Sequence, residues 1–244
     1  MTFRMLGAGP AGWGAARRLV DAGHQDWELW EADGGPGGLS RSGGGSVYVT
    51  GNSNTYSGAT LISSTLYLGR TNVAAGVFGS GPITNTSNLF IDRSGSFVSS
   101  NGFFGSGSTS IRYGGEMVMS ASFSSNSTFR VGAGTLTLTN GAQLVAYGRF
   151  YFADRTLGYP VDPTNITATL NVHENASLAT YSFEAGNGGS VAGGGMTGTV
   201  NQTGGLLRTT GWSGDPVNFP GEYDGLRIAH YPQAYGVYNL SGGT

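Results

Sequence analysis

The residues of this sequence that could do chemistry are concentrated near the amino terminus, in residues 7–12, which read GAGPAG. Glycines at this spacing have separate roles in a dinucleotide-binding unit. Gly7 permits a tight turn, Gly9 lets the backbone approach a pyrophosphate, and Gly12 lets a helix pack closely on a strand. Glu31, about 20 residues further on, could accept hydrogen bonds from ribose hydroxyls. The candidate cofactor-binding residues of this part are therefore Gly7, Gly9, Pro10, Ala11, Gly12 and Glu31.

A strand, a helix and a second strand are needed to position these residues. Residues 2–6 predict the first strand, and a helix is expected to continue to about Ala22, with Gly23 as its stop signal. Residues 27–31 predict the second strand, which ends in the acid. The helix N-terminus would then offer free N–H groups and a positive dipole end to the phosphates. The residues alone leave open a glycine-rich turn followed by an unrelated helix.

No other catalytic or metal-binding constellation is expected. The chain has neither cysteine nor lysine, which excludes thiolate metal sites, a cysteine nucleophile, a lysine Schiff base and a GK[ST] phosphate loop. Glu222 and Asp224 could bind calcium or act as acids, but a solvated loop is the favoured interpretation. His24, His173 and His230 lie in separate segments, and each is expected to be satisfied or exposed.

The composition limits partners and sets a domain boundary. Of 244 residues only 11% are charged, and the net charge of -2 gives no reason to expect nucleic acid as a partner. No apolar run approaches the roughly 20 residues of a membrane span, and no export signal is seen, which keeps a cytoplasmic location open. Charged residues and tryptophans are concentrated before residue 42. We expect a cofactor-binding unit over 1–42, a flexible linker over 43–46 and a second domain over 47–244.

The second domain is predicted from a repeated unit that is clearest in residues 51–69. This segment reads as turn, strand, turn and strand, and similar material returns in residues 134–141. Many short strands alternate apolar residues with Thr, Ser, Arg or Asn, which is typical of strands with one buried face. Repeats of about 20 residues suit one turn of a parallel β-helix, and a β-sandwich is the alternative.

The expected fold is therefore mainly β. It is a right-handed parallel β-helix, or solenoid, preceded by a small incomplete Rossmann-like βαβ unit. Leu and β-branched residues would fill the interior, and Asn and Ser at the corners would stack as ladders.

Four short stretches before residue 43 carry a family resemblance: residues 6–12, 15–19, 27–32 and 35–42. Together they resemble the opening of flavin-dependent oxidoreductases of the amine oxidase and UDP-galactopyranose mutase group. The resemblance implies FAD rather than NAD, with Gly37 and Gly38 in a second glycine loop near the diphosphate and Arg41 close to it. It covers about the first sixth of the chain. The further strands, flavin pocket and substrate domain of such an enzyme do not follow.

Later stretches carry a second resemblance, in residues 54–60, 65–69, 76–83, 198–205 and 238–244. They resemble the autotransporter-associated β-strand repeat of bacterial passenger domains. That resemblance implies a right-handed β-helix and export to the cell surface. Because residues 241–244 fall inside a repeat, we expect the chain to be a fragment truncated at its carboxyl end.

These observations favour a non-enzymatic function. The leading expectation is a passenger-like solenoid for surface display, adhesion or self-association, with surface carbohydrate or protein as its ligand and no required cofactor. Residues 1–42 would be a vestigial or fused FAD motif that caps the first repeat through Trp13, Leu19 and Val20. One alternative is a flavin-dependent oxidoreductase, similar to UDP-galactopyranose mutase, that lacks its catalytic part. A second alternative is a carbohydrate-active β-helix.

Overall fold

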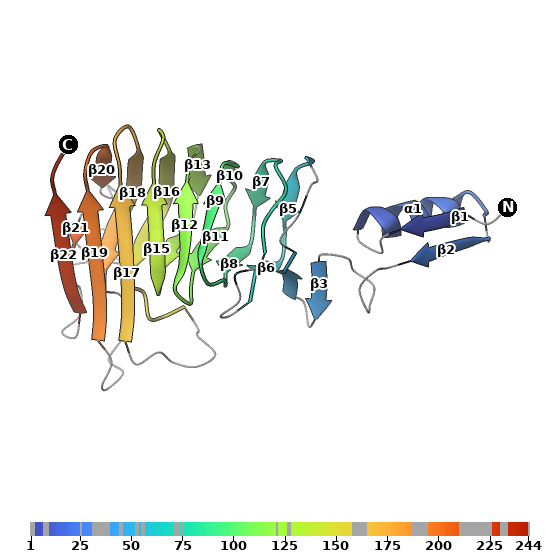
Figure 1. Ribbon diagram of the computed structural model, residues 1–244, viewed down its shortest axis with the longest axis horizontal. Helices are drawn as coiled ribbons and strands as arrows, with labels where there is room; N and C mark the ends of the chain where they lie inside the picture. The colour runs from blue at the N-terminus through green and yellow to red at the C-terminus, as the bar shows by residue number, and fades with distance from the viewer. Residues whose placement is uncertain are drawn as a thin grey trace, which may run out of the picture.

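The structure begins with a strand, a helix and a strand, in the order expected from the sequence. Strand β1 (Phe3–Leu6) pairs in parallel with β2 (Trp27–Trp30), and α1 (Pro10–Asp21) connects them (Figure 1). The computed structural model describes residues 3–6, 10–24, 26–30, 40–43, 46–51, 54, 57–70, 74, 76–120, 122–125, 128–157, 165–186, 195–209, 226–229 and 234–243.

Helix α1 ends at a glycine, as predicted. Gly23 has a φ of 81°, in the left-handed region that glycine adopts without steric cost. Its N–H donates to the Val20 carbonyl at 2.9 Å, and the His24 N–H donates to the Leu19 carbonyl at 2.9 Å. This pair of bonds is a Schellman motif, which satisfies carbonyls at the helix end. Val20, to which we assigned a capping role, is 51% exposed.

The remaining strands are short in the first half of the chain and longer in the second. They are β3 (Ser40–Gly43), β4 (Ser46–Val49), β5 (Thr60–Ile62), β6 (Thr65–Leu68), β7 (Ile83–Asn85), β8 (Asn88–Ile91), β9 (Ser96–Ser99), β10 (Phe103–Phe104), β11 (Ser108–Ile111), β12 (Gly115–Met119), β13 (Ser122–Ser125), β14 (Phe129–Val131), β15 (Gly134–Leu138), β16 (Gln143–Phe152), β17 (Asn165–Val172), β18 (Ser177–Ala185), β19 (Gly195–Gln202), β20 (Leu206–Thr209), β21 (Leu226–Arg227) and β22 (Ala234–Leu240).

These strands form parallel sheets, so the fold is mainly β as predicted. An eleven-stranded sheet has the order β20-β18-β16-β14-β11-β8-β6-β4-β3, with β13 beside β16 and β21 beside β18. A six-stranded sheet has the order β22-β19-β17-β15-β12-β9, and a three-stranded sheet the order β10-β7-β5. From β14 to β20, consecutive strands alternate between the two large sheets (Figure 1).

The long strands β16 and β18 each belong to two rows of strands. The first half of β16 pairs with β13 and its second half pairs with β14, and the register shifts between Ala146 and Arg149. Strand β18 pairs with β20 and then with β21 in the same way. Because β10 contacts β13, the three-stranded sheet continues the row formed by the first half of β16. The described strands after residue 45 therefore lie in three parallel rows.

The boundary expected at residues 43–46 falls within a pair of strands. Strand β3 pairs with β4 in antiparallel fashion, with Arg41 opposite Tyr48 and Gly43 opposite Ser46. Every other strand pair among the described residues is parallel. Residues 40–43 thus lie at the edge of the eleven-stranded sheet.

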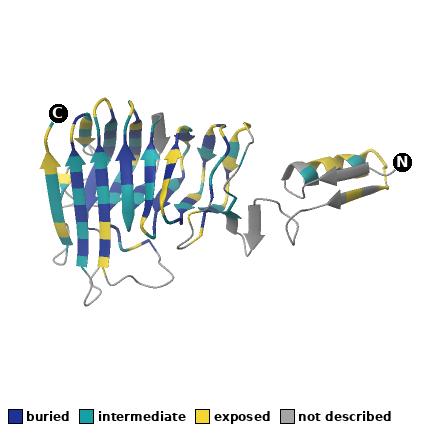
Figure 2. Cartoon of the chain, in the orientation of Figure 1, coloured by how far each residue is buried: buried dark blue, intermediate teal, exposed yellow. Residues whose placement is uncertain are grey.

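Side chains stack from strand to strand because neighbouring strands are in register. The rings of Phe129, Phe150 and Phe183 lie with centroids 5.6 and 5.2 Å apart and nearly parallel. Leu136 and Leu170 are paired in the six-stranded sheet, and both are fully buried. Buried residues alternate with more exposed ones along β17 and β19 (Figure 2). This alternation is what one buried sheet face requires.

The expected repeat length of about 20 residues holds in the first half of the chain only. Asn88 pairs with Ser108, which lies 20 residues further on. Asn165 pairs with Gly195, 30 residues further on. The later units are longer because longer segments connect their strands.

Replacing Gly134 by alanine is expected to destabilise the fold by at least about 1 kcal/mol. Gly134 has a φ of 138°, and an added Cβ would lie 2.4 Å from the Gly115 carbonyl oxygen. Urea denaturation measures the effect. The control is Gly58→Ala, because a Cβ at that position meets nothing within 4 Å. Equal stability of the two variants would show that the Gly134 backbone relaxes freely.

Candidate functional site

The predicted cofactor site lies only partly in the described structure. Pro10 begins α1, and Gly12 lies half-buried in its first turn beside Ala11. Arg41, expected near a diphosphate, lies in β3 opposite Tyr48. That this segment is a vestigial or fused FAD motif remains a prediction. The residues of the predicted site that lie outside the described ones are Gly7, Gly9, Glu31, Gly37 and Gly38.

Most of the other residues singled out for chemistry lie outside the described part of the chain. Glu222, Asp224 and His230 lie outside the described residues, and His24 is exposed after α1. In the part of the chain that the structure describes, no group of three His, Asp or Glu side chains could hold a metal ion. None of the described helices is long and apolar enough to cross a membrane.

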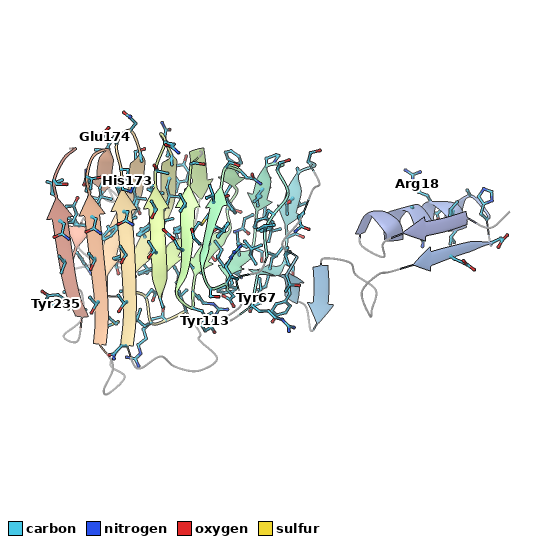
Figure 3. The ribbon with its side chains drawn as sticks, in the orientation of Figure 1. Arg18, Tyr67, Tyr113, His173, Glu174 and Tyr235 are labelled. Atoms are coloured by element: carbon cyan, nitrogen blue, oxygen red, sulfur yellow. The ribbon has the colours of Figure 1, made fainter. Side chains whose placement is uncertain are left out.

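A polar hollow of about 770 Å³ lies where β15, β17 and β19 end (Figure 3). Its turns need left-handed backbone: Asn140 has a φ of 52° and Asn175 a φ of 61°. Asparagine tolerates this region better than most residues do. The lining contains hydroxyls, amides, an imidazole and one carboxylate, from Thr139, Asn140, Gly141, His173, Glu174, Asn175 and Thr203.

His173 is the central residue of this hollow. Its Nδ1 lies 3.0 Å from Oγ1 of Thr203, which is 30 residues away in the chain. The backbone N–H groups of both residues continue the strand ladder. The His173 N–H donates to the Leu138 carbonyl and the Thr203 N–H donates to the Val172 carbonyl, each at 3.0 Å. Thr139 donates in the same way to Met119 at 3.1 Å. The three side chains are therefore successive members of one row across the strands.

The outer surface of β15, β17, β19 and β22 adjoins this row, and we call it the threonine–asparagine face. Asn171 donates to Thr137 Oγ1 at 3.1 Å, Asn201 to Asn171 Oδ1 at 3.0 Å and Asn239 to Asn201 Oδ1 at 2.8 Å. The stacked asparagines expected at corners thus form a ladder along the outer side of strands. Each asparagine amide donates to the side chain on the preceding strand, so the hydrogen bonds of the ladder all run in the same direction, from β22 toward β15.

Threonines fill the rest of the face. Thr167 pairs with Thr197 and Thr169 with Thr199 in adjacent strands. No hydrogen bond from these four hydroxyls to another described residue occurs, so they are open to solvent or a ligand. The exposed ring of Tyr235, 66% accessible, lies next to Thr197 on β22.

Comparison with known proteins identifies no relative. No family model, no curated protein and no solved structure matches this chain. The hollow and the threonine–asparagine face present hydroxyls and amides, which donate and accept hydrogen bonds, beside the methyl groups of threonine. Such groups suit the binding of a polar ligand.

The outer face of the eleven-stranded sheet is different, because it holds buried ion pairs. Arg112 Nε donates to Asp92 Oδ1 at 2.7 Å, a second guanidinium N–H donates to Asp92 Oδ2, and Nη1 donates to the Leu157 carbonyl at 3.0 Å. The guanidinium lies 4.3 Å from the centroid of Phe90. Burial lowers the pKa of Arg112, whereas the Asp92 carboxylate raises it, and the net shift is upward. The guanidinium is thus held in place by the Asp92 carboxylate, the Leu157 carbonyl and the Phe90 ring.

The other buried acids of this face also meet arginines. Asp154, fully buried, accepts from Arg130 Nη1 at 3.2 Å and from the Thr156 N–H at 2.9 Å. Glu184 lies 3.9 Å from Arg149 Nη1. These acids therefore hold strands and the segment after β16 together.

The sequence did contain a signal for the hollow that we did not use. Three strands in turn are followed by polar turns of similar form, TNG after Leu138, HEN after Val172 and TGG after Gln202. Aligning these three turns would have placed His173 beside Thr203. His173, expected to be satisfied or exposed, has Thr203 as its partner.

Proposed function

We propose that residues from about 46 to 244 form a right-handed parallel β-helix that acts as a non-enzymatic, passenger-like scaffold for surface display or adhesion. The supporting observation is the arrangement of parallel strands in three rows, in which each strand pairs with its counterpart in the next unit. A chain that coils around an axis produces this pattern. Right-handedness follows from the rule that parallel crossover connections are right-handed in about 98% of cases.

The packing supports a scaffold rather than an enzyme. Ring stacks, leucine stacks and buried arginine–carboxylate pairs join each unit to the next. A solenoid of such units is rigid because every unit contacts its neighbours on both sides. The hollow and the threonine–asparagine face are then the surfaces available for attachment. In this proposal residues 1–42 are a vestigial or fused FAD motif.

The test compares attachment with catalysis. Beads coated with the folded full chain are expected to attach to carbohydrate-coated or protein-coated surfaces, and beads coated with the denatured chain are not. The soluble protein is expected to bind no flavin in equilibrium dialysis and to release no product from polysaccharides. Failure to attach to any surface would refute the adhesive function. Stoichiometric FAD binding with turnover of an electron donor would instead support the oxidoreductase alternative.

A further inference from the structure

The threonine–asparagine face carries no charge, which limits what it can bind. Its four strands have the sequences GTLTL, NITATLNV, GMTGTVNQ and AYGVYNL, and none contains Asp, Glu, Lys or Arg. The eleven-stranded sheet, by contrast, presents Arg112, Arg130 and Arg149 with their acids. An uncharged partner loses no ionic hydration against an uncharged surface, whereas nucleic acid or an acidic polymer would find no counter-charge there.

The face is also regular and mostly hydroxylated. Neighbouring strands lie about 4.8 Å apart and successive outward residues about 6.6 Å apart, so the four strands span about 14 Å and the four outward positions of β17 and β19 span about 20 Å. A threonine offers one hydroxyl and one methyl. The face therefore presents hydroxyls beside methyl groups at four paired positions, Thr167, Thr169, Thr197 and Thr199. A sugar ring has the same mixture, with hydroxyls at its edge and C–H groups on its faces.

Two further features lie at opposite ends of the strands (Figure 3). At one end is the hollow of about 770 Å³, a volume within the range of small-ligand sites, with polar groups that suit ring hydroxyls. At the other end is the exposed ring of Tyr235, which can pack against the C–H face of a sugar. A protein partner would instead favour a central cluster of buried aromatic and arginine anchors, which this face does not offer.

We infer that the threonine–asparagine face, with Tyr235 and the hollow around His173, binds an extended neutral polysaccharide. The inference rests on the proposed adhesive function and names its ligand class. Sugar rings would lie across the strands, with hydroxyls bonded to the open threonines. Glu174 and the asparagine amides of the hollow would bond the hydroxyls of one further sugar unit.

The experiment uses the full chain and defined polysaccharides. Co-sedimentation with cellulose and affinity electrophoresis in dextran or laminarin measure binding to neutral glucans, and polygalacturonate is the acidic probe. We expect binding to at least one neutral glucan that does not weaken between low and high salt, because no charges are paired. Thr169→Arg and Tyr235→Ala should each weaken this binding about tenfold. His173→Ala should weaken it as well.

Matched variants act as controls. Thr84→Arg changes a half-buried threonine on β7 and Tyr147→Ala removes a ring that is 59% exposed on β16, both away from the face. Both should bind as the unchanged chain does, and circular dichroism should show that all variants are folded. Absence of binding to every neutral glucan would overturn the inference. Salt-sensitive binding to polygalacturonate alone would also overturn it. If the coated beads of the attachment assay still adhered in either case, the proposed adhesive function would be retained and only its ligand class would be wrong.

Discussion

Replacement of Phe150 by alanine is expected to lower the free energy of unfolding by about 3–5 kcal/mol. Phe150 is fully buried between Phe129 and Phe183, with interplanar angles of 1° and 8°. Its removal leaves a cavity and also ends the ring stack that joins three successive units. Because neighbouring strands fix the backbone on both sides, the cavity cannot close by local collapse. Urea denaturation followed by circular dichroism measures the loss.

The same change is expected to reduce cooperativity. In the proposed solenoid each unit contacts only its neighbours, so a weak interface in the middle lets the two halves unfold separately. The urea transition should therefore broaden or divide into two steps. Tyr147→Ala is the control, since that ring is 59% exposed on the same strand and its loss should change stability by no more than about 0.5 kcal/mol. Equal losses in the two variants would show that the phenylalanine stack does not carry the stability.

Local features of the fold could be predicted because they depend on local chemistry. The period-2 alternation of residues 167–172 predicts a strand, which lies within β17, and Gly23 marks the end of α1. The apolar patterns of residues 143–147 and 149–152 predict two strands, whereas the structure has one strand, β16, with a register shift after Ala146. The shift lies where β16 passes from one row of strands to the next, and alternation alone does not reveal such a passage.

Features that depend on partners distant in the chain were missed. The glycine-rich run at residues 43–46 has the composition of a flexible linker, yet Gly43 and Ser46 are paired in a two-strand hairpin. Composition predicts the flexibility of an isolated chain segment. At the edge of a sheet, unpaired backbone N–H and C=O groups can bind such a segment and order it. The hollow was missed for a similar reason. His173 contacts Thr203 because β19 pairs with β17 at a spacing of 30 residues. The spacing between paired strands varies along this chain, so the sequence alone does not give that value.

The second large effect is expected from breaking the Asp92–Arg112 pair. Asp92→Ala should cost about 3–5 kcal/mol, because the guanidinium stays buried without its counter-charge. Arg112 also holds the Leu157 carbonyl and lies against Phe90. The double variant Asp92→Leu with Arg112→Met should be more stable than Asp92→Ala alone, because it removes both charges and keeps volume. Urea denaturation of Asp92→Leu, Arg112→Met and the double variant gives the coupling energy between the two residues.

The pH dependence separates this ion pair from simple packing. The folded-state pKa of Arg112 is raised, so the stabilisation it contributes is complete below the unfolded-state pKa and is lost only as pH rises through the folded value. Arginine titrates far above neutral pH, and the stability difference between the unchanged chain and Arg112→Met should therefore be constant from neutral to moderately alkaline pH. A difference that fell over that range would mean that another group titrates against Arg112.

A double variant no more stable than Asp92→Ala would show that the cost comes from lost packing around Phe90 rather than from an unpaired charge.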